Sequence, residues 1–291
     1  MKDLKGKVAF ITGAASGIGF ALAHACSEQG MRVMLADIDA SALDKAVTEL
    51  RDSQFDVDGV ICDVTSEQSL RAAAAATIER FGKVHMLVNN AGVLVVGGAG
   101  ENSLDTWRWI MEINVLGVIY GTEIFLPLIR EHGEGGHILN TASVGGHVAF
   151  SGVLAYCTTK HAVVGYTEAL ADQLKEENIG VSALCPGFTK TRIAESERFD
   201  GNQENDAGKG GGFVQALEAG MSPDAVAKFT MEQIQRDALY IFTHPGTRGE
   251  VALRWSDISH ALDATDASEV INSDPDAQRV ARKDETDGLY H

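Results

Sequence analysis

The chain has little positive charge: 24 lysine and arginine residues stand against 41 aspartate and glutamate residues, and the formal net charge is −17. A surface that binds nucleic acid or an anionic membrane needs clustered lysine and arginine side chains. The composition therefore argues against both kinds of partner.

Cysteine is also scarce, and no metal-binding motif is present. Cys26, Cys62, Cys157 and Cys185 form no Cys-x-x-Cys pair and no metal-ligand spacing. The nine histidines include no His-Glu-x-x-His set, so we expect no metal ion. No apolar run is long enough to cross a bilayer, and no apolar signal segment follows Met1. These absences indicate reduced thiols in a soluble, cytoplasmic protein.

What the chain does have, through residue 185, is a regular alternation of short apolar runs with helical stretches. Runs that are apolar throughout are typical of parallel strands buried on both faces, with helices as crossovers. The predicted strands are Val8–Thr12, Arg32–Ala36, Asp58–Cys62, Met86–Asn89, His137–Thr141 and Gly180–Leu184, with Leu239–Phe242 as a seventh, edge strand. The predicted helices are Gly17–Gly30, Ser41–Leu50, Thr65–Arg80, Leu104–Arg130 and Ala155–Lys175. The predicted fold class is α/β: a single-domain Rossmann-type, doubly wound parallel sheet of about seven strands, with helices on both faces.

No linker interrupts this series, so we predict one domain over residues 1–255 and an acidic extension over 256–291. Residues 190–222 follow the sixth strand, where a lid over the substrate is expected. Within them, Asp200–Phe213 holds five glycines in fourteen residues, which indicates a mobile lid or a tolerated surface insertion. The extension carries nine acids against three bases and is predicted to be a solvated helix or a frayed terminus.

A glycine-rich segment, Thr12–Gly19, follows the first strand and opens the first helix. At such a junction the glycines allow a tight turn, and a pyrophosphate can lie on the helix N-terminal N–H groups. The predicted phosphate-binding residues are Gly13, Ser16, Gly17, Ile18 and Gly19.

Asp37 ends the second strand, 18 residues after Gly19. A carboxylate there accepts hydrogen bonds from the adenosine ribose and repels a 2′-phosphate. Ile38, Asp39 and Ser16 add no positive charge, so NAD is favoured over NADP as the cofactor. We expect Ser41, in a capping-box-like pair with Asp44, to cap the following helix, which leaves Asp37 and Ile38 for the cofactor.

Four further residues suggest catalysis. Tyr156 and Lys160 are spaced i and i+4, on one helix face. Ser143 lies 13 residues before Tyr156, just after the fifth strand, and Asn114 lies within the long preceding helix. With the glycine loop, Asp63-Val64, Asn89-Asn90-Ala91-Gly92 and Pro186-Gly187 with Thr191, this pattern over residues 5–192 resembles the short-chain dehydrogenase/reductase family.

The resemblance implies a role for each residue. Tyr156 would be the general acid/base at the reacting oxygen, and Lys160 would favour its phenolate form and bind the nicotinamide ribose. Ser143 would donate to the substrate oxygen, and Asn114 would anchor a water that links Lys160 to solvent. The other cofactor contacts implied by the resemblance are Asp63 and Val64 at the adenine, Asn90, Ala91 and Gly92 beside the adenosine ribose, and Pro186, Gly187, Thr189 and Thr191 around the carboxamide.

The substrate is less constrained by the sequence. Residues beside the catalytic ones are mostly apolar, which favours a neutral aromatic or alicyclic secondary alcohol or ketone. They are Val93, Leu94, Val95, Val144, Gly145, His147, Phe150, Phe188 and Ile193, with His147 more typical of a solvated loop histidine. Three short stretches of the C-terminal half are similar to bacterial dehydrogenases of benzylic aryl-ether alcohols: Arg192–Ser196, Ala238–Ile241 and Ser273–Val280. A hydroxysteroid, a 3-oxoacyl or polyketide substrate, and a catalytically silent cofactor-sensing regulator remain open.

The family resemblance also implies self-association. Its members pair through helices that correspond to Leu104–Arg130 and Ala155–Lys175, so we expect a homo-oligomer, either a dimer or a tetramer, with a homotetramer favoured.

Overall fold

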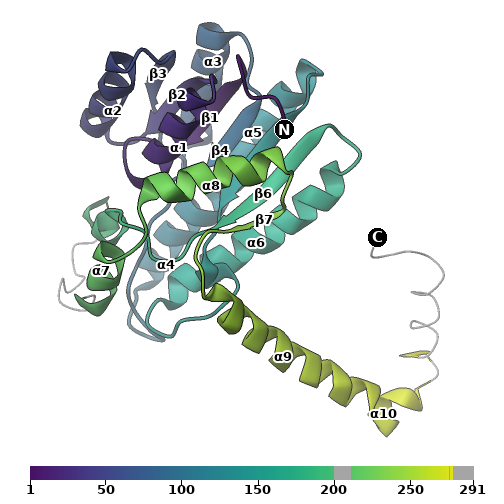
Figure 1. Cartoon of the computed structure of the whole chain (residues 1–291). Coiled ribbons are helices and arrows are strands. Elements are labelled where there is room, and N and C mark those ends of the chain that lie inside the picture. The colour runs from purple at the N-terminus through teal and green to yellow at the C-terminus, as the bar shows by residue number, and fades with distance from the viewer. Residues whose placement is uncertain (200–210, 275, 278–291) are drawn as a thin grey trace. The chain divides into compact units, whose positions relative to one another are not determined.

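A computed structural model describes residues 1–199, 211–274 and 276–277 of the chain (Figure 1). Its contacts divide the chain into two units, Met1–Pro245 and Gly246–His291. The predicted boundary at 255/256 falls inside helix α9 (Thr247–Asp266), and the predicted division of the chain stays a prediction. The predicted mobility of Asp200–Phe213 concerns residues that lie mostly outside the described ones.

The first unit is built on a seven-stranded sheet in the order β3-β2-β1-β4-β5-β6-β7, with every neighbouring pair parallel. This arrangement confirms the predicted doubly wound, Rossmann-type fold. The strands are β1 (Val8–Thr12), β2 (Arg32–Asp37), β3 (Val57–Ile61), β4 (Met86–Asn89), β5 (Gly136–Thr141), β6 (Ile179–Cys185) and β7 (Tyr240–Phe242).

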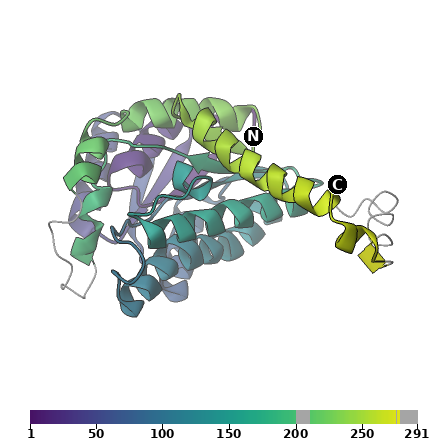
Figure 2. The ribbon, with the colours of Figure 1, turned by 90° about the horizontal axis from the view of Figure 1, so that it is seen from below.

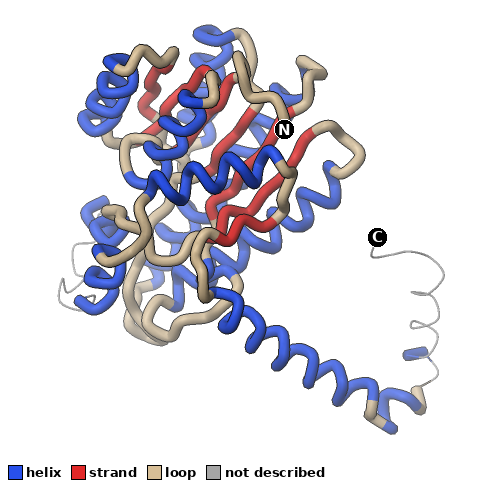
Figure 3. Tube along the Cα trace, viewed as in Figure 1, coloured by secondary structure: helices blue, strands red, loops and turns tan. Residues whose placement is uncertain are grey.

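Helices cover both faces of the sheet (Figures 1 and 3). One face carries α1 (Gly17–Glu28), α2 (Ala40–Asp52) and α8 (Pro223–Gln235). The other face carries α3 (Glu67–Phe81), α5 (Gly117–Glu131) and α6 (Leu154–Leu174). The same layering is visible from below in Figure 2. The other α-helices of the described residues are α4 (Leu104–Met111), α7 (Gly211–Glu218) and, in the second unit, α9 and α10 (Glu269–Asn272). Two short 3-10 helices, η2 (Val144–Gly146) and η3 (Ile193–Phe199), follow β5 and β6.

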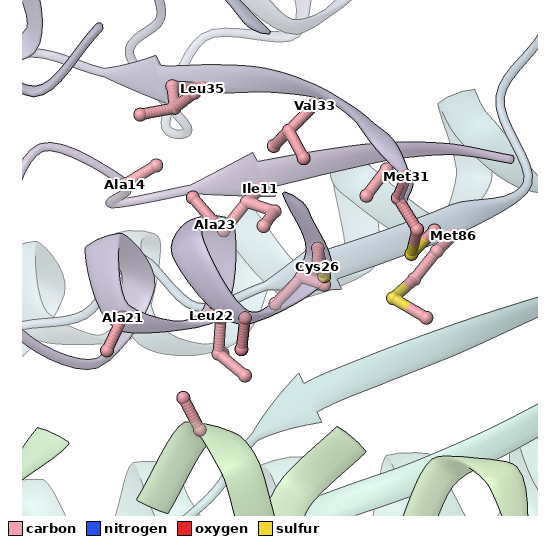
Figure 4. Close-up of a cluster of buried hydrophobic side chains, with 14 of the residues drawn as sticks. Ile11, Ala14, Ala21, Leu22, Ala23, Cys26, Met31, Val33, Leu35 and Met86 are labelled. Atoms are coloured by element: carbon pink, nitrogen blue, oxygen red, sulfur yellow. The ribbon is translucent and has the colours of Figure 1, made fainter. Parts of the chain in front are cut away.

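The two layers explain why the strands are apolar throughout. Ile11, Val33 and Leu35 lie in the cluster shared with α1, where they pack with Leu22 (Figure 4). Phe10, the neighbour of Ile11, points to the opposite face and stacks on Phe125 of α5 with ring centroids 4.3 Å apart. Because successive strand residues alternate between faces, both must be apolar when both faces are covered.

Two helix starts differ from the prediction. Asp39, not Ser41, caps α2, and its carboxylate accepts from the Ala42 N–H at 3.0 Å. Ser66 caps α3, whereas Thr65 uses both its N–H and its hydroxyl on Asp63. The predicted cap Ser41 lies two residues after Asp39, and the predicted helix start Thr65 lies one residue before Ser66, because several adjacent residues can accept from a free N–H.

The long predicted helix Leu104–Arg130 is interrupted. Between α4 and α5 the chain forms a π-helical turn, η1 (Glu112–Leu116), which contains Asn114. The expectation that no run is long enough to cross a bilayer needs correction: among the described residues one run, Leu104–Glu131, has the length and composition to do so. Half of its most apolar stretch is buried inside the fold. Such burial is typical of a core helix in a globular domain. The π turn bears on the site, because such bulges inside α-helices are frequent at functional sites.

Candidate active site

The carboxyl edge of the sheet gathers the predicted site residues. In a parallel sheet all strand C-termini lie at one edge, where ligands of this fold bind. The glycine loop follows β1, Asp37 ends β2, and the segments after β4, β5 and β6 begin at Asn90, Ala142 and Pro186. The predicted cofactor and catalytic residues therefore share one edge.

The glycine positions of this loop leave little or no space for a Cβ. Gly13 and Gly17 have φ values of 64° and 58°, in the region that favours glycine. A Cβ on Gly19 would lie 2.1 Å from the Gly13 carbonyl oxygen, and one on Gly17 would lie 3.1 Å from Thr191 Cγ2. Ser16 is the N-cap residue of α1, and its side chain makes no cap hydrogen bond. The backbone can thus approach a pyrophosphate at the N-terminus of α1, and the predicted Thr191 lies beside it; Ile18 is half-buried against the core.

Thr12, which the sequence reading did not assign to the site, holds the loop to its neighbour. Its hydroxyl oxygen accepts from the N–H groups of Asn90 and Ala91 at 2.9 and 3.0 Å. The Asn90 amide donates back to the Thr12 carbonyl at 3.0 Å, and a Cβ on Gly13 would lie 2.9 Å from Ala91 Cα. The contact spans 78 residues, so local sequence gave no signal for it.

Asp37 faces the glycine loop. One carboxylate oxygen accepts from the Ala15 N–H at 3.0 Å and the other from the Asp39 N–H at 3.0 Å. Asp39 caps α2, so Asp37 is not committed to that helix. Ile38 beside it is about half exposed.

Asp63 is bonded within its own turn. Its carboxylate accepts from the Thr65 N–H at 2.9 Å and from the Thr65 hydroxyl at 2.7 Å. Val64 is buried, and a Cβ on Gly117 would lie 3.0 Å from its Cγ2. The Asp63 side chain thus fixes the turn that carries Val64.

Tyr156, Lys160 and Ser143 meet at the end of β5. Lys160 Nζ donates to the Thr141 carbonyl at 2.8 Å and lies 5.6 Å from the centre of the Tyr156 ring. The Ser143 hydroxyl is hydrogen-bonded to Tyr156, and its oxygen accepts from the Gly145 N–H at 3.0 Å. The spacing in the sequence and the position after β5 correctly placed these three side chains together.

Burial shifts both titratable groups toward their neutral forms. It raises the pKa of Tyr156 to about 12, while the hydrogen bond from Ser143 opposes this change. It lowers the pKa of Lys160 to about 8. We predicted that the Lys160 cation lowers the Tyr156 pKa. Among the protein's own groups, the effect of burial on Tyr156 is larger, and burial also disfavours the Lys160 cation itself.

The Asn114 side chain is fully engaged. Its carbonyl oxygen accepts from the Val93 N–H at 2.8 Å, and its amide donates to the Val93 carbonyl at 2.9 Å and to Thr159 at 3.0 Å. A Cβ on Gly92 would lie 3.3 Å from Asn114 Oδ1 and 3.5 Å from Lys160 Nζ. Asn114 thus holds the Gly92–Val93 backbone next to Lys160. Its side-chain oxygen and its side-chain nitrogen are both hydrogen-bonded to protein groups.

The predicted substrate residues divide into two groups. Val93, Leu94, Val95 and Val144 are buried; Val93 and Val95 pack with Ile110 and Ala155 beneath Tyr156. Gly145 is also buried, and a Cβ on it would lie 3.6 Å from the Tyr156 ring. The second group is partly exposed and holds Phe150, Phe188 and Ile193.

His147 corrects a prediction. It is buried rather than solvated, with Nε2 3.3 Å from Cys185 Sγ and its ring 4.8 Å from that of Phe242. The edge strand β7 supplies this aromatic cover, and sequence position alone did not show that it would lie there.

His244 is a second residue that the sequence reading missed. Its Nδ1 accepts from the Gly187 N–H at 3.0 Å, and its Nε2 bonds the Phe188 carbonyl at 2.8 Å. That carbonyl also accepts from the Met221 N–H at 2.9 Å. The Thr189 hydroxyl donates to the Gly187 carbonyl at 3.2 Å. The segment that follows Pro186 is therefore held from two sides.

Comparison with known proteins adds four findings. The family model described as short chain dehydrogenase matches residues 7–201. A CLA biosynthesis dehydrogenase/reductase of Lactiplantibacillus plantarum is 34% identical over 84% of this chain and 90% of its own length. A C alpha-dehydrogenase of a Sphingobium species is 30% identical over 96% of this chain and 92% of its own. A short chain dehydrogenase/reductase from Burkholderia phymatum, solved in complex with NAD, superposes with a TM-score of 0.86 at 39% identity, covering 90% of this chain and 97% of that one.

Proposed function

The chain belongs to the short-chain dehydrogenase family, and on that premise we propose that it is an NAD-dependent alcohol dehydrogenase, which interconverts a secondary alcohol and a ketone. One observation carries the proposal: Tyr156, Lys160 and Ser143 meet next to the Ala91–Gly92 backbone, which packs closely on a loop whose glycines leave little or no space for a Cβ. A phenol, an ammonium and a hydroxyl in this arrangement suit proton transfer at an alcohol oxygen.

The residues present fit a dinucleotide. The Gly13–Gly19 backbone and the N-terminus of α1 would hold the pyrophosphate, and Asp37 would accept from the adenosine ribose. Ala15, Ser16, Ile38 and Asp39 bring no positive charge for a 2′-phosphate. Asp37 is the basis for proposing NAD rather than NADP.

Tyr156 and Ser143 would both act on the substrate oxygen, in different ways. Tyr156 would take the proton of the substrate hydroxyl, and Ser143 would donate a hydrogen bond to the same oxygen. The Ser143 contact with the Pro186 carbonyl is long, 3.4 Å, so a substrate oxygen can replace it. When bound, NAD⁺ supplies the hydride acceptor. Because Tyr156 must lose its proton, we expect alcohol oxidation to become faster as pH rises.

Lys160 would bind the nicotinamide ribose, and it would lie on the route by which the proton leaves Tyr156 for solvent. Since both side-chain atoms of Asn114 are bonded to protein groups, a water that links Lys160 to solvent would bind the Asn114 main-chain carbonyl. The Asn114 side chain then positions the Gly92–Val93 backbone.

The substrate we propose is an apolar aromatic or alicyclic secondary alcohol, such as a benzylic aryl-ether alcohol. Phe150 and Phe188 present partly exposed aromatic rings. The Phe150 N–H donates to Sγ of Cys157, the chain neighbour of Tyr156, at 3.4 Å, and Phe188 meets Phe213 edge to face at 5.2 Å between centroids. The likeness to a C alpha-dehydrogenase supports the benzylic class. A hydroxysteroid is the alternative of similar shape.

Two other functions make different predictions. A 3-oxoacyl or polyketide reductase would prefer NADPH, against which Asp37 argues. A catalytically silent cofactor-sensing regulator would bind NAD without turnover, against which the intact Tyr156 and Lys160 argue.

The test is a panel of secondary alcohols with NAD⁺ or NADP⁺, read by absorbance of the reduced cofactor. It should include benzylic aryl-ether and steroid alcohols. We expect turnover of a benzylic or alicyclic alcohol with kcat/KM higher for NAD⁺ than for NADP⁺. Equal values with both cofactors would remove the basis for the cofactor assignment, and no turnover of any alcohol would favour the regulator.

We also propose that the protein is a cytoplasmic homo-oligomer, with a tetramer favoured over a dimer. Leu116 and Leu154, at the start of α5 and α6, are exposed apolar side chains on the helices expected to pair. Light scattering coupled to size exclusion measures the mass directly, and a monomer would contradict the proposal.

A further inference from the structure

A pocket of about 430 Å³ lies at the amino edge of the sheet. Its residues precede or begin β1, β2, β4 and β5, whereas the catalytic residues follow strand C-termini at the opposite edge. The pocket is lined by Lys5, Gly6, Lys7, Arg32, Phe81, Gly82, Lys83, His85 and Glu134. Nothing in the proposed dehydrogenase reaction uses these residues.

The pocket concentrates positive charge in a strongly acidic protein. Four of its lining residues are lysine or arginine and one is a carboxylate, which leaves a formal charge of +3 with His85 neutral. The whole chain has a formal charge of −17. A concave site lined by one sign of charge raises the local concentration of counter-ions.

Three donors converge on one carboxylate inside this pocket. Lys7 Nζ lies 2.5 Å from Glu134 Oε2, Lys83 Nζ bonds Oε1, and His85 Nε2 lies 3.1 Å from Oε2. His85 is buried, and its Nδ1 accepts from the Val8 N–H at 3.1 Å, so the ring proton is on Nε2 and points at Glu134. These donors hold the pKa of Glu134 well below its usual range, with Lys7 the largest influence. The cradle suits an oxyanion.

A competing anion can displace the Glu134 carboxylate from these three donors. It is exposed on a turn between Gly133 and Gly135, which have φ values of 67° and 78°. Ion pairs between exposed side chains are weak. Within the described residues, no carboxylate pairs with Lys5 or Arg32; Arg32 donates to the Gly6 and Phe81 carbonyls at 3.2 and 3.3 Å. The pocket therefore has more cationic charge than Glu134 neutralises.

A metal ion fits this cluster poorly. His85, His132 and Glu134 offer ligand atoms within 4.8 Å of one another. However, His132 accepts from the Glu134 N–H at 3.2 Å and bonds the Val84 carbonyl at 2.8 Å through its other nitrogen. Both nitrogens of each ring are thus engaged, and two lysine ammonium groups would repel a cation.

We propose that this basic pocket binds a phosphate-bearing small molecule. A terminal phosphoryl group takes the place of the Glu134 carboxylate on Lys7, Lys83 and the His85 Nε2–H. Further negative charge on the ligand lies near Arg32 and Lys5, and the Phe81 ring, with Arg32 5.7 Å from its centre, forms the apolar wall.

The test is a calorimetric titration of the full chain with inorganic pyrophosphate at constant ionic strength, run once without NAD⁺ and once with saturating NAD⁺. We expect saturable binding, weakened about tenfold in Lys83→Ala because one charge-assisted bond is lost. Lys175→Ala removes an exposed lysine elsewhere and should leave binding unchanged. Glu134→Gln should bind several-fold more tightly, because the internal competitor loses its charge; a variant that failed to fold could not gain affinity.

Three outcomes would overturn the proposal. One is the absence of binding in both the wild type and Glu134→Gln. Another is equal binding by Lys83→Ala and Lys175→Ala, which would show an adventitious ion only. The third is binding that NAD⁺ abolishes, which would place pyrophosphate at the glycine loop. All three are distinguishable from failure of the dehydrogenase proposal, since none depends on turnover.

Discussion

Replacing Thr12 with valine removes one hydroxyl and leaves two N–H groups without an acceptor. Thr12 is 2% exposed, and its oxygen accepts from Asn90 and Ala91 at 2.9 and 3.0 Å. Each unsatisfied buried donor costs about 1–3 kcal/mol. Because Asn90 and Ala91 are only partly buried, water can reach part of this turn. We therefore expect Thr12→Val to lower the free energy of unfolding by about 2–3 kcal/mol, toward the lower end of the summed range.

Urea unfolding followed by circular dichroism measures this change, and the midpoint should fall with an unchanged slope. Thr12→Ser is the matched control: it keeps the acceptor oxygen and removes only a methyl group, so it should lose about 1 kcal/mol or less. The valine variant should also bind NAD⁺ more weakly, because Thr12 holds Asn90–Ala91 against the glycine loop.

This reasoning would be refuted if the free energy of unfolding of Thr12→Val lay within about 0.5 kcal/mol of the wild-type value. A change of that size is typical of a surface position without such contacts. Serine and valine variants that lose equal stability would do so too, because the cost would then arise from packing rather than from the acceptor.

Three further predictions concern charge and positioning. Asp37→Asn should lower the ratio of kcat/KM for NAD⁺ over NADP⁺ by about tenfold or more, since one charge-assisted bond is worth roughly that factor; an unchanged ratio in steady-state assays would exclude Asp37 from cofactor selection. His244→Ala should raise KM for NAD⁺ while circular dichroism stays unchanged, and His244→Gln, which can still donate to the Phe188 carbonyl, should recover part of the loss; no recovery would argue against the clamp. Burial lowers the pKa of His137 to about 3 from 6.5. The contribution of neutral His137 to the free energy of unfolding should therefore be complete above pH 6.5 and fall as the pH drops toward 3, by at most about 1.4 kcal/mol per pH unit. Urea unfolding of His137→Gln at several pH values should show a shallower pH dependence.

The sheet could be predicted from the sequence because the apolar pattern of each strand is visible within a few consecutive residues. Strand residues such as Phe10 and Ile11 must both be apolar when helices cover both faces, and the pattern records that requirement. The same holds for Tyr156 and Lys160, whose spacing alone places them on one helix face.

What the sequence could not show depends on contacts across the chain. Thr12 reaches Asn90 over 78 residues, and His244 reaches Gly187 over 57. The π turn at Asn114 and the burial of His147 beneath β7 likewise depend on neighbours that no local pattern reports.

The most direct test of the central claim compares wild type with Tyr156→Phe in a single assay of NAD⁺ reduction by the best alcohol of the panel, with NAD⁺ affinity measured in parallel. General acid/base residues contribute about 10²–10⁴-fold to rate. We predict a loss of kcat in that range with NAD⁺ affinity nearly unchanged. Turnover by Tyr156→Phe at the wild-type rate would contradict the account.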